Sequence, residues 1–561
     1  MTFTNRLLVA FSLLIISTLP TIANPTVTSP TNRESVSSPF LLSASAKTCD
    51  GVKVTTMGYS LDSLSTSSVV EGTSIDTHVV ATPGKHNLHV KSWGKKVECT
   101  TTIAVTVPST ALPILAEAEA TDADGLPVSP RFLGLAHEWA SPEIGYSAQL
   151  LMGDQASGVD PIYRQLVANF AAWGSGPMVI RIGGNSTDTF TSPQSTQAFK
   201  ELNEYNGALF YLGINLKNAT LQQAQTIAST YYVAMPQSAL LGLEIGNEPD
   251  GYGLTEAQFV ANFNQWAVGI RAVTSPQLPI MGPSCSTWAC SWGPMQWNEA
   301  ILSTAVANNI TAFSQHQYIE GQSPAADALL LPAAYPVPST TQPLIAQAHQ
   351  LGMPFRVAEW NSDWMPNTAI SGQFQSALWG LKSLYTYASL GADGVNIFGN
   401  WDVNNGFNIA QISIADGTPN LYSLVQVMPL YYGALAFQMG TGHAAQVFPV
   451  TVTSGTSTAV SAFDTTDSTG TERMTLISLD ESQSGAVTVH PQGTYTKAQV
   501  CYLSAPAYTS TTKVTLCGQT FDGSTNGVIQ GAATYTTLDQ VDGAFAVPLE
   551  STQAAIITFV R

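Results

Sequence analysis

Charged side chains are scarce in this chain of 561 residues: only 10% of them are Asp, Glu, Lys or Arg, and the net charge is −18. Nucleic acids and anionic membrane surfaces attract proteins through basic patches, so this balance argues against both as partners. Long apolar runs are also lacking beyond the N-terminus, where no segment reaches the roughly 18 residues that a membrane helix needs. The mature chain is therefore expected to be soluble.

Residues 1–23 have the pattern of a signal peptide. Arg6 precedes an apolar run from Leu7 to Leu19, and the small residue Ala23 stands at the expected cleavage position. The alternative, a membrane anchor, is disfavoured because the apolar run is short for a span. We expect a secreted or periplasmic protein.

Cysteine is rare as well, with six residues in the chain. An exported protein keeps its disulfides, and pairing within each domain is the most economical of the possible connectivities. Pairing within each domain predicts the bridges Cys49–Cys99, Cys285–Cys290 and Cys501–Cys517. A metal site is the alternative, but no pair has a CxxC spacing or a nearby histidine. We therefore expect neither a metal nor a cofactor.

Changes in periodicity divide the mature chain into three regions. Residues 24–107 alternate apolar and polar side chains between turn-forming residues, which predicts an immunoglobulin-like β-sandwich whose two sheets are linked by Cys49–Cys99. This module is expected to act as a spacer, or alternatively to bind polysaccharide. Residues 108–431 are assigned to a catalytic barrel, preceded by a linker with a stray strand over Pro108–Pro127. Residues 432–561 return to short alternating runs and predict a C-terminal β-sandwich.

Eight buried strand-like runs alternate with helix-like segments in the central region. The runs cover residues 132–139, 178–188, 208–216, 240–250, 278–286, 311–319, 354–362 and 392–401. Eight such alternations are typical of a (β/α)₈ TIM barrel. An open doubly wound sheet, the alternative, would place a glycine-rich phosphate turn after its first strand, and FLGLAHEW has none.

Two glutamates stand at the ends of two of these strands. Glu248 follows the apolar run LLGLEIG, and Glu359 ends the run PFRVA. Barrel enzymes keep their catalytic groups at the carboxyl ends of the strands, and two carboxylates facing a sugar are the minimum for glycoside hydrolysis. Each glutamate alone could simply cap the next helix. For the pair, the catalytic interpretation is favoured.

The other strand ends supply polar and aromatic groups, which suit sugar hydroxyls and ring faces. The candidate substrate-binding residues are Glu138, Asn185, Asn247, His316, Tyr318, Trp364 and Trp401. A structural role is the alternative for His316, as is packing beneath the loops for the tryptophans. Arg181 is expected to point at a nearby carboxylate and keep it ionised, and Asp188 either to anchor its turn or to pair with Arg181.

Four motifs in order, RIGGNSTD, LEIGNEPD, QHQY and VAEWNS, resemble glycoside hydrolase family 79 of clan A, which contains β-glucuronidases and heparanase. The resemblance runs from about Phe132 to the C-terminus. It implies a retaining mechanism in which Glu248 is the acid/base and Glu359 is the nucleophile.

The same resemblance implies roles around these two glutamates. Asn247 would hold the sugar 2-hydroxyl and Tyr318 would orient the nucleophile. Glu138 and Asn185 match positions that touch the glycone, the sugar on the non-reducing side of the cleaved bond.

The chain departs from the family just after the nucleophile. Glucuronidases of the family hold the sugar's carboxylate with a Tyr and a Gly there, whereas WNSDWMPN places Trp364 and Pro366 at about those positions, beside Asp363. Residues 111–431 contain 8 Lys and Arg against 23 Asp and Glu, a field that would repel a sulfated polysaccharide.

The sequence thus predicts a secreted, monomeric exo-β-glycosidase acting on an oligosaccharide or glycoconjugate. The first substrate hypothesis is terminal β-linked (4-O-methyl-)glucuronic acid, hydrolysed by double displacement. The alternatives are a clan-A glycosidase for a neutral sugar and a catalytically inactive carbohydrate-binding protein.

Overall fold

The computed structural model describes residues 24–36, 38–65, 68–79, 81, 84–107, 112–121, 123–141, 146–173, 176–286, 309–319, 341–363, 368–403, 408–414, 422–443 and 445–561. The chain forms two compact units, Met1–Ala111 and Leu112–Arg561. The predicted signal peptide lies outside the described residues. None of the helices within those ranges is long and apolar enough to cross a membrane.

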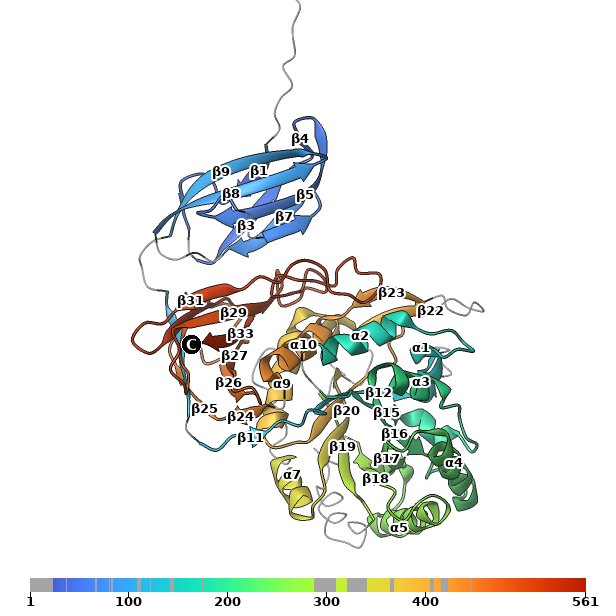
Figure 1. The fold of residues 1–561 in the computed structure, drawn as a ribbon. Coiled ribbons are helices and arrows are strands. Elements are labelled where there is room, and N and C mark those ends of the chain that lie inside the picture. The colour runs from blue at the N-terminus through green and yellow to red at the C-terminus, as the bar shows by residue number, and fades with distance from the viewer. Residues whose placement is uncertain are drawn as a thin grey trace, which may run out of the picture. The chain divides into compact units, whose positions relative to one another are not determined.

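The first unit is a small sandwich of two β-sheets (Figure 1). One sheet has the order β1-β3-β7, formed by Thr26–Ser29, Phe40–Ser45 and Ser74–Val79. The other has the order β2-β9-β8-β5-β4, with β6 beside β5; these strands are Glu34–Ser35, Val97–Val107, Gly84–Gly94, Val52–Leu61, Thr48–Cys49 and Ser68–Glu71. Alternate side chains such as Leu42 and Val90 are fully buried between the sheets.

The predicted bridge Cys49–Cys99 is present in this unit, with a Cα–Cα distance of 5.6 Å. Its predicted placement between the two sheets is wrong, because β4 and β9 belong to the same sheet. The bridge instead ties the end strand of that sheet to a strand near its opposite edge. The alternation of apolar residues predicted the sandwich but could not tell which sheet each strand joins.

A closed parallel barrel forms the centre of the second unit and confirms the predicted TIM-barrel fold (Figure 1). Its strands are β12 (Leu133–Glu138), β15 (Val179–Gly183), β16 (Leu209–Ile214), β17 (Leu240–Ile245), β18 (Ile280–Cys285), β19 (Ala312–Ile319), β20 (Phe355–Asp363) and β21 (Gly394–Phe398). Each of the eight predicted runs overlaps one of these strands. They read as apolar runs because side chains on both faces of a parallel barrel are buried.

Helices follow most of the strands and cover the barrel. They are α1 (Ala148–Met152), α2 (Pro161–Ala171), α3 (Gln197–Asn206), α4 (Leu221–Ala234), α5 (Glu256–Val273), α7 (Thr341–Gln350), α8 (Thr368–Ser371) and α9 (Phe374–Ser389). Helices α4 and α5 each begin with a capping box, Thr220 with Gln223 and Thr255 with Gln258. The reciprocal hydrogen bonds satisfy backbone groups at the helix start and fix where each helix leaves its loop.

The C-terminal β-sandwich is built from two sheets. One has the order β25-β10-β28-β32, with strands Val450–Ser454, Ile114–Ala120, Gly485–His490 and Phe545–Leu549. The other has the order β11-β24-β26-β27-β33-β29-β30, with β31 beside β29; these strands are Leu126–Pro127, Gln446–Phe448, Val460–Thr466, Glu472–Ser478, Ala554–Val560, Lys497–Ser504, Thr515–Leu516 and Thr536–Asp539. The predicted bridge Cys501–Cys517 joins β29 to the residue after β30.

Three elements depart from the predicted domain borders. Strand β10, assigned to a linker before the barrel, pairs with β25 and β28 of the sandwich, and β11 pairs with β24. The predicted start of the sandwich at Tyr432 falls inside α10 (Pro429–Thr441), a helix buried along its whole length. An all-round apolar helix has no exposed polar face, so it must lie between two layers.

Helices α9 and α10 connect the barrel to the sandwich. Tyr385 of α9 packs against Phe437 of α10 and stacks on Phe463 of β26, with ring centroids 4.9 and 4.8 Å apart. The Tyr385 hydroxyl also lies 2.8 Å from Oγ1 of Thr475 in β27. The sandwich is therefore joined to the barrel by a common core.

The remaining described strands form two short pairs beside the barrel. Strands β13 (Ala140–Ser141) and β14 (Tyr146–Ser147) follow β12, and β22 (Ala410–Ile414) and β23 (Tyr422–Val427) follow β21.

Candidate active site

The candidate residues gather at the carboxyl ends of the barrel strands. Arg181 lies in β15, His316 and Tyr318 lie in β19, Glu359 lies in β20, and Glu248 follows β17. Strand register brings these ends together: His316 of β19 is directly opposite Glu359 of β20. The structure therefore assembles the two predicted catalytic glutamates at one rim of the barrel.

Glu359 is buried and held by two strong donors. Nη1 of Arg181 donates to its Oε2 at 2.6 Å, and the Tyr318 hydroxyl donates to its Oε1 at 2.5 Å. Burial by itself would raise the pKa of Glu359, but His316, Arg181 and Tyr318 together outweigh it and lower the pKa below the usual value. The carboxylate is therefore held ionised and in a fixed orientation, as the sequence predicts for the partner of Arg181.

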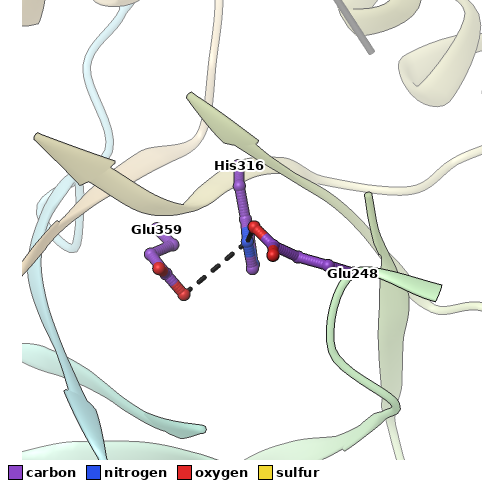
Figure 2. Close-up of side chains that lie close together, drawn as sticks. All are labelled: Glu248, His316 and Glu359. Atoms are coloured by element: carbon purple, nitrogen blue, oxygen red, sulfur yellow. Dashed lines mark hydrogen bonds and ion pairs between the residues drawn. The ribbon is translucent and has the colours of Figure 1, made fainter. Parts of the chain in front are cut away.

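Glu248 occupies a left-handed backbone conformation, with φ of +49°, directly before the short 3₁₀ helix η2 (Pro249–Tyr252). Its N–H donates to the carbonyl of Ser284 at 3.0 Å. A non-glycine residue in this region is uncommon and marks a turn held by its surroundings. The turn directs the partly exposed Glu248 carboxylate toward His316 and Glu359 (Figure 2).

His316 lies between the two glutamates (Figure 2). Its Nδ1 is 3.0 Å from Oε1 of Glu248 and 3.6 Å from Oε2 of Glu359. Complete burial would lower the pKa of His316, but the charges of Glu359 and Glu248 overcome this and raise it. The imidazole therefore contacts the Glu248 carboxylate and lies close to that of Glu359, and its predicted part in substrate binding stays a prediction.

One carboxylate oxygen from each glutamate and a nitrogen of His316 lie within 4.8 Å of one another, an arrangement that could also hold a metal ion. The Glu359 oxygen nearest His316 is Oε2, which already accepts a hydrogen bond from Arg181. A cation there would lie beside a guanidinium group, and like charges repel. The charge of Arg181 therefore disfavours a metal ion among these three side chains.

Arg181 is fully buried and divides its donors among three acceptors. Besides Glu359, Nε donates to Oε2 of Glu244 and Nη2 donates to Oδ1 of Asn247, each at 2.7 Å. Glu244 also accepts a short hydrogen bond from the Ser284 hydroxyl. The sequence patterns assign no role to Glu244, Ser284 or Tyr252, and the charge of Glu244 inside an apolar strand is the one signal that points to any of them.

The turn that carries Glu248 is braced by Tyr252. The Tyr252 hydroxyl accepts from the backbone N–H of Asn247 at 2.8 Å and donates to Oδ1 of Asp188 at 2.6 Å. The Asp188 carboxylate thus braces the turn of Glu248, whereas its predicted roles were to anchor its own turn or to pair with Arg181; Nζ of Lys217 lies 3.8 Å from its Oδ2. Burial raises the pKa of Asp188 to about 6 despite this hydrogen bond.

Glu138 ends β12 and is cradled by the loop after β15. It accepts hydrogen bonds from the N–H groups of Asn185 and Ser186 at 3.0 and 2.8 Å, and from the Ser186 hydroxyl. Burial raises the pKa of Glu138 to about 7 against these bonds, and the charge of Glu359 adds to the rise. Asn247 contacts the same loop, since its Nδ2 lies 3.3 Å from Oδ1 of Asn185. The polar candidates therefore surround the glutamate pair.

The structure describes one of the two aromatic candidates, Trp401. Trp401 has no exposed surface and packs on Tyr163 and His137, with ring centroids 4.7 and 5.8 Å away. Its predicted stacking on a substrate is therefore wrong, because the rings beneath the rim already cover the indole. Trp364 lies outside the described residues and stays a prediction, and so does the bridge Cys285–Cys290, because Cys290 lies outside them too.

A closed eight-stranded parallel barrel, with two glutamates at its rim and a β-sandwich attached, is an arrangement found in glycoside hydrolases. The family model of the glycosyl hydrolase family 79 C-terminal beta domain matches residues 452–556. The resemblance to family 79 is thereby confirmed, and the chain carries the C-terminal β domain of that family. No curated protein sequence matches the chain.

Solved structures of glycosidases share the fold. A 4-O-α-L-rhamnosyl-β-D-glucuronidase from Fusarium oxysporum 12S, in complex with Rha-GlcA, aligns with a TM-score of 0.61 at 17% identity, covering 80% of this chain and all of that one. The family 51 arabinofuranosidase from Xanthomonas axonopodis pv. citri gives 0.59 at 16% identity, covering 79% and 100%. An α-L-arabinofuranosidase from Thermotoga maritima gives 0.56 at 15%, covering 79% and 99%. Fold and family domain together support a glycosidase.

Proposed function

We propose that this protein is a retaining exo-β-glycosidase that releases terminal β-linked glucuronic acid or its 4-O-methyl ether. The observation that carries the mechanism is the spacing of the glutamate pair, whose nearest oxygens lie within 4.8 Å of each other. Retaining enzymes hold their carboxyl groups about 5–5.5 Å apart, whereas inverting enzymes leave about 6.5–9.5 Å for a water molecule. The short spacing supports double displacement.

The surroundings of each glutamate support its role. Glu359 is kept ionised by Arg181 and Tyr318, so it attacks the anomeric carbon and forms a glycosyl ester. Glu248 donates its proton to the glycosidic oxygen as the leaving group departs. In the second step Glu248 takes a proton from water, the water attacks the anomeric carbon, and Glu359 is released. His316 borders both carboxylates throughout.

This mechanism is tested by two variants. Glu359→Ala should lose nearly all turnover, and azide should restore part of the rate by forming the glycosyl azide of inverted configuration. Glu248→Ala should keep the first step for aryl glycosides with very good leaving groups, since these need no proton. Near wild-type activity of both variants would refute the assignment.

The glucuronide specificity is supported by the family 79 domain and by the fold shared with a protein named as a rhamnosyl-glucuronidase. A neutral sugar is the second candidate, because residues 361–380 after the nucleophile contain no Lys or Arg to meet a uronate. A buried carboxylate without hydrogen-bond donors would go uncompensated. Backbone N–H groups would have to replace the missing cation.

A panel of aryl β-glycosides separates these two candidates, with glucuronide beside glucoside, galactoside and xyloside, and with arabinofuranoside added. The proposal expects kcat/KM for the glucuronide to exceed that for the glucoside by at least ~100-fold, as for a site built to bind one polar group of its substrate. Equal rates, or preference for a neutral sugar, would refute the glucuronidase and retain the mechanism.

A further inference from the structure

Glu244 is a second carboxylate on the strand that carries the acid/base, and the mechanism proposed above does not use it. It is fully buried in β17, four positions before Glu248. It lies below the rim and contacts no reacting atom through its described hydrogen bonds, which go to Arg181 and Ser284. A buried ionisable group is costly unless it is paired, so its place in the barrel calls for a function.

The guanidinium of Arg181 joins this carboxylate to the nucleophile. Its Nε–H donates to Glu244 at 2.7 Å and its Nη1–H donates to Glu359 at 2.6 Å, with both arginine and Glu244 fully buried. Because the guanidinium is a rigid plane, the bond at Nε sets where the Nη groups point. Glu244 thereby aims Nη1 at the nucleophile and Nη2 at Asn247.

The charge balance gives Glu244 a second effect. One guanidinium serves two carboxylates, so its positive charge is shared between Glu244 and Glu359. A carboxylate that had Arg181 to itself would be more stable as an anion and hence a weaker nucleophile. Sharing keeps Glu359 ionised but leaves it reactive.

We propose that Glu244 is a positioning residue of the reaction, which orients Arg181 and limits how strongly Arg181 stabilises the nucleophile Glu359. This inference rests on the proposed function for the identity of the nucleophile. The groups that face Glu359 are Arg181 from β15, His316 and Tyr318 from β19, and Glu248 at the end of β17. Glu138 from β12 adds a negative charge nearby. Glu244 acts on Glu359 only through Arg181.

The test compares the full-length wild type with Glu244→Gln, which keeps the shape and an acceptor for Arg181 but removes the charge. Arg181 then stabilises Glu359 alone, so the acid limb of the kcat/KM profile should move to lower pH by about one unit, the size expected for removing one nearby charge. The plateau of kcat/KM should fall ~10-fold, because the carboxylate is less nucleophilic. Glu201→Gln is the matched control.

Glu201 is a buried carboxylate of α3 beside Arg164, with 3.7 Å between its Oε2 and Nη2 of Arg164, and its described contacts include none of the rim residues. Glu201→Gln removes a buried charge without changing the site, so the acid limb of its kcat/KM profile should stay in place. Ser284→Ala is a second variant if Glu244→Gln does not fold. It removes a hydrogen bond from Glu244 but leaves Arg181 and Glu359 intact; Glu244 then draws more of the Arg181 charge, so the limb should move in the opposite direction, to higher pH.

A readout without turnover separates this inference from the proposed function. The ¹³C carboxyl resonance of Glu359, assigned through Glu359→Gln, should titrate about one unit lower in Glu244→Gln than in wild type. If wild type cleaves no aryl glycoside, the proposed function fails, and this titration still decides the role of Glu244. An unchanged midpoint and an unchanged limb in the Glu244 and Ser284 variants would overturn the proposal, whatever stability they lose.

Discussion

Replacing Tyr318 with Phe removes one hydroxyl that holds the nucleophile. The hydroxyl donates to Oε1 of Glu359 at 2.5 Å, while the ring packs edge-on against Phe398 with centroids 6.4 Å apart. A hydrogen bond to a charged group contributes about 1.5–3 kcal/mol, and 1.36 kcal/mol corresponds to one pKa unit. The variant should therefore raise the pKa of Glu359 by about 1–2 units and keep the packing of the ring.

The sign of the effect follows from the state that reacts. Glu359 must be ionised to attack, so a higher pKa moves the acid limb of kcat/KM upward, and at pH values below the new limb the variant should be ~10-fold or more slower than wild type. The free energy of unfolding should fall as well. Because folding lowers the pKa of Glu359, its contribution to stability is present above the unfolded pKa and is lost as pH falls through the folded pKa. The variant reduces that contribution.

The assay is the pH dependence of kcat/KM on the best aryl β-glycoside, over the range in which both proteins stay folded. Tyr231→Phe is the control, because Tyr231 in α4 is a buried tyrosine whose hydroxyl accepts one bond, from the Gln194 N–H at 3.1 Å. Its acid limb should match wild type. An acid limb of Tyr318→Phe that stays in place or moves downward would refute the electrostatic reasoning about Glu359.

Four further predictions concern contacts around the site and the cysteines. Tyr252→Phe leaves the Asn247 N–H without its partner, so kcat should fall about 10- to 100-fold with little change in KM in steady-state assays, and unchanged kcat would contradict the bracing role. Gly184→Ala places a Cβ against the Glu138 carboxylate at a backbone φ of +71°, so it should abolish most activity while circular dichroism shows a folded barrel; full activity would argue against the cradle. Non-reducing peptide mapping should find Cys285 joined to Cys290, and removing Cys501–Cys517, which closes a loop with a sequence separation of 16, should lower the unfolding free energy by about 3 kcal/mol in denaturant titrations.

The barrel was predictable because its sequence pattern is strong. Each strand is an apolar run ending in turn-forming residues, and Glu248 and Glu359 stand where such runs end. The alternation of strands and helices then requires their side chains to share a rim. The pairing of Arg181 with a carboxylate was predictable for the same reason, since a buried arginine must find an anion.

Other features depend on contacts that no local pattern encodes. Strand β10 joins the sandwich across more than 300 positions of chain, from Ala116 to Ser454, so its Ala-rich sequence resembles a linker. Trp401 at the end of the last barrel strand could equally stack on a sugar or pack under the rim; only the positions of Tyr163 and His137 decide between the two. Glu244 was missed because strand periodicity assigns it simply to the core.

The different catalytic roles proposed for the two glutamates follow from their neighbours as well as from the motif that carries each. Glu359 accepts from Arg181 and Tyr318 and is nearly enclosed, with 10% of its side chain exposed, which favours a fixed anion. Glu248 keeps 31% of its side chain exposed and contacts His316, so water and a leaving group can reach it and protons can be exchanged there. Two carboxyl groups in unlike surroundings can take unlike protonation states at one pH. If the roles were reversed, the nucleophile would be the group with fewer donors and more solvent, and the acid would have to hold a proton beside a guanidinium.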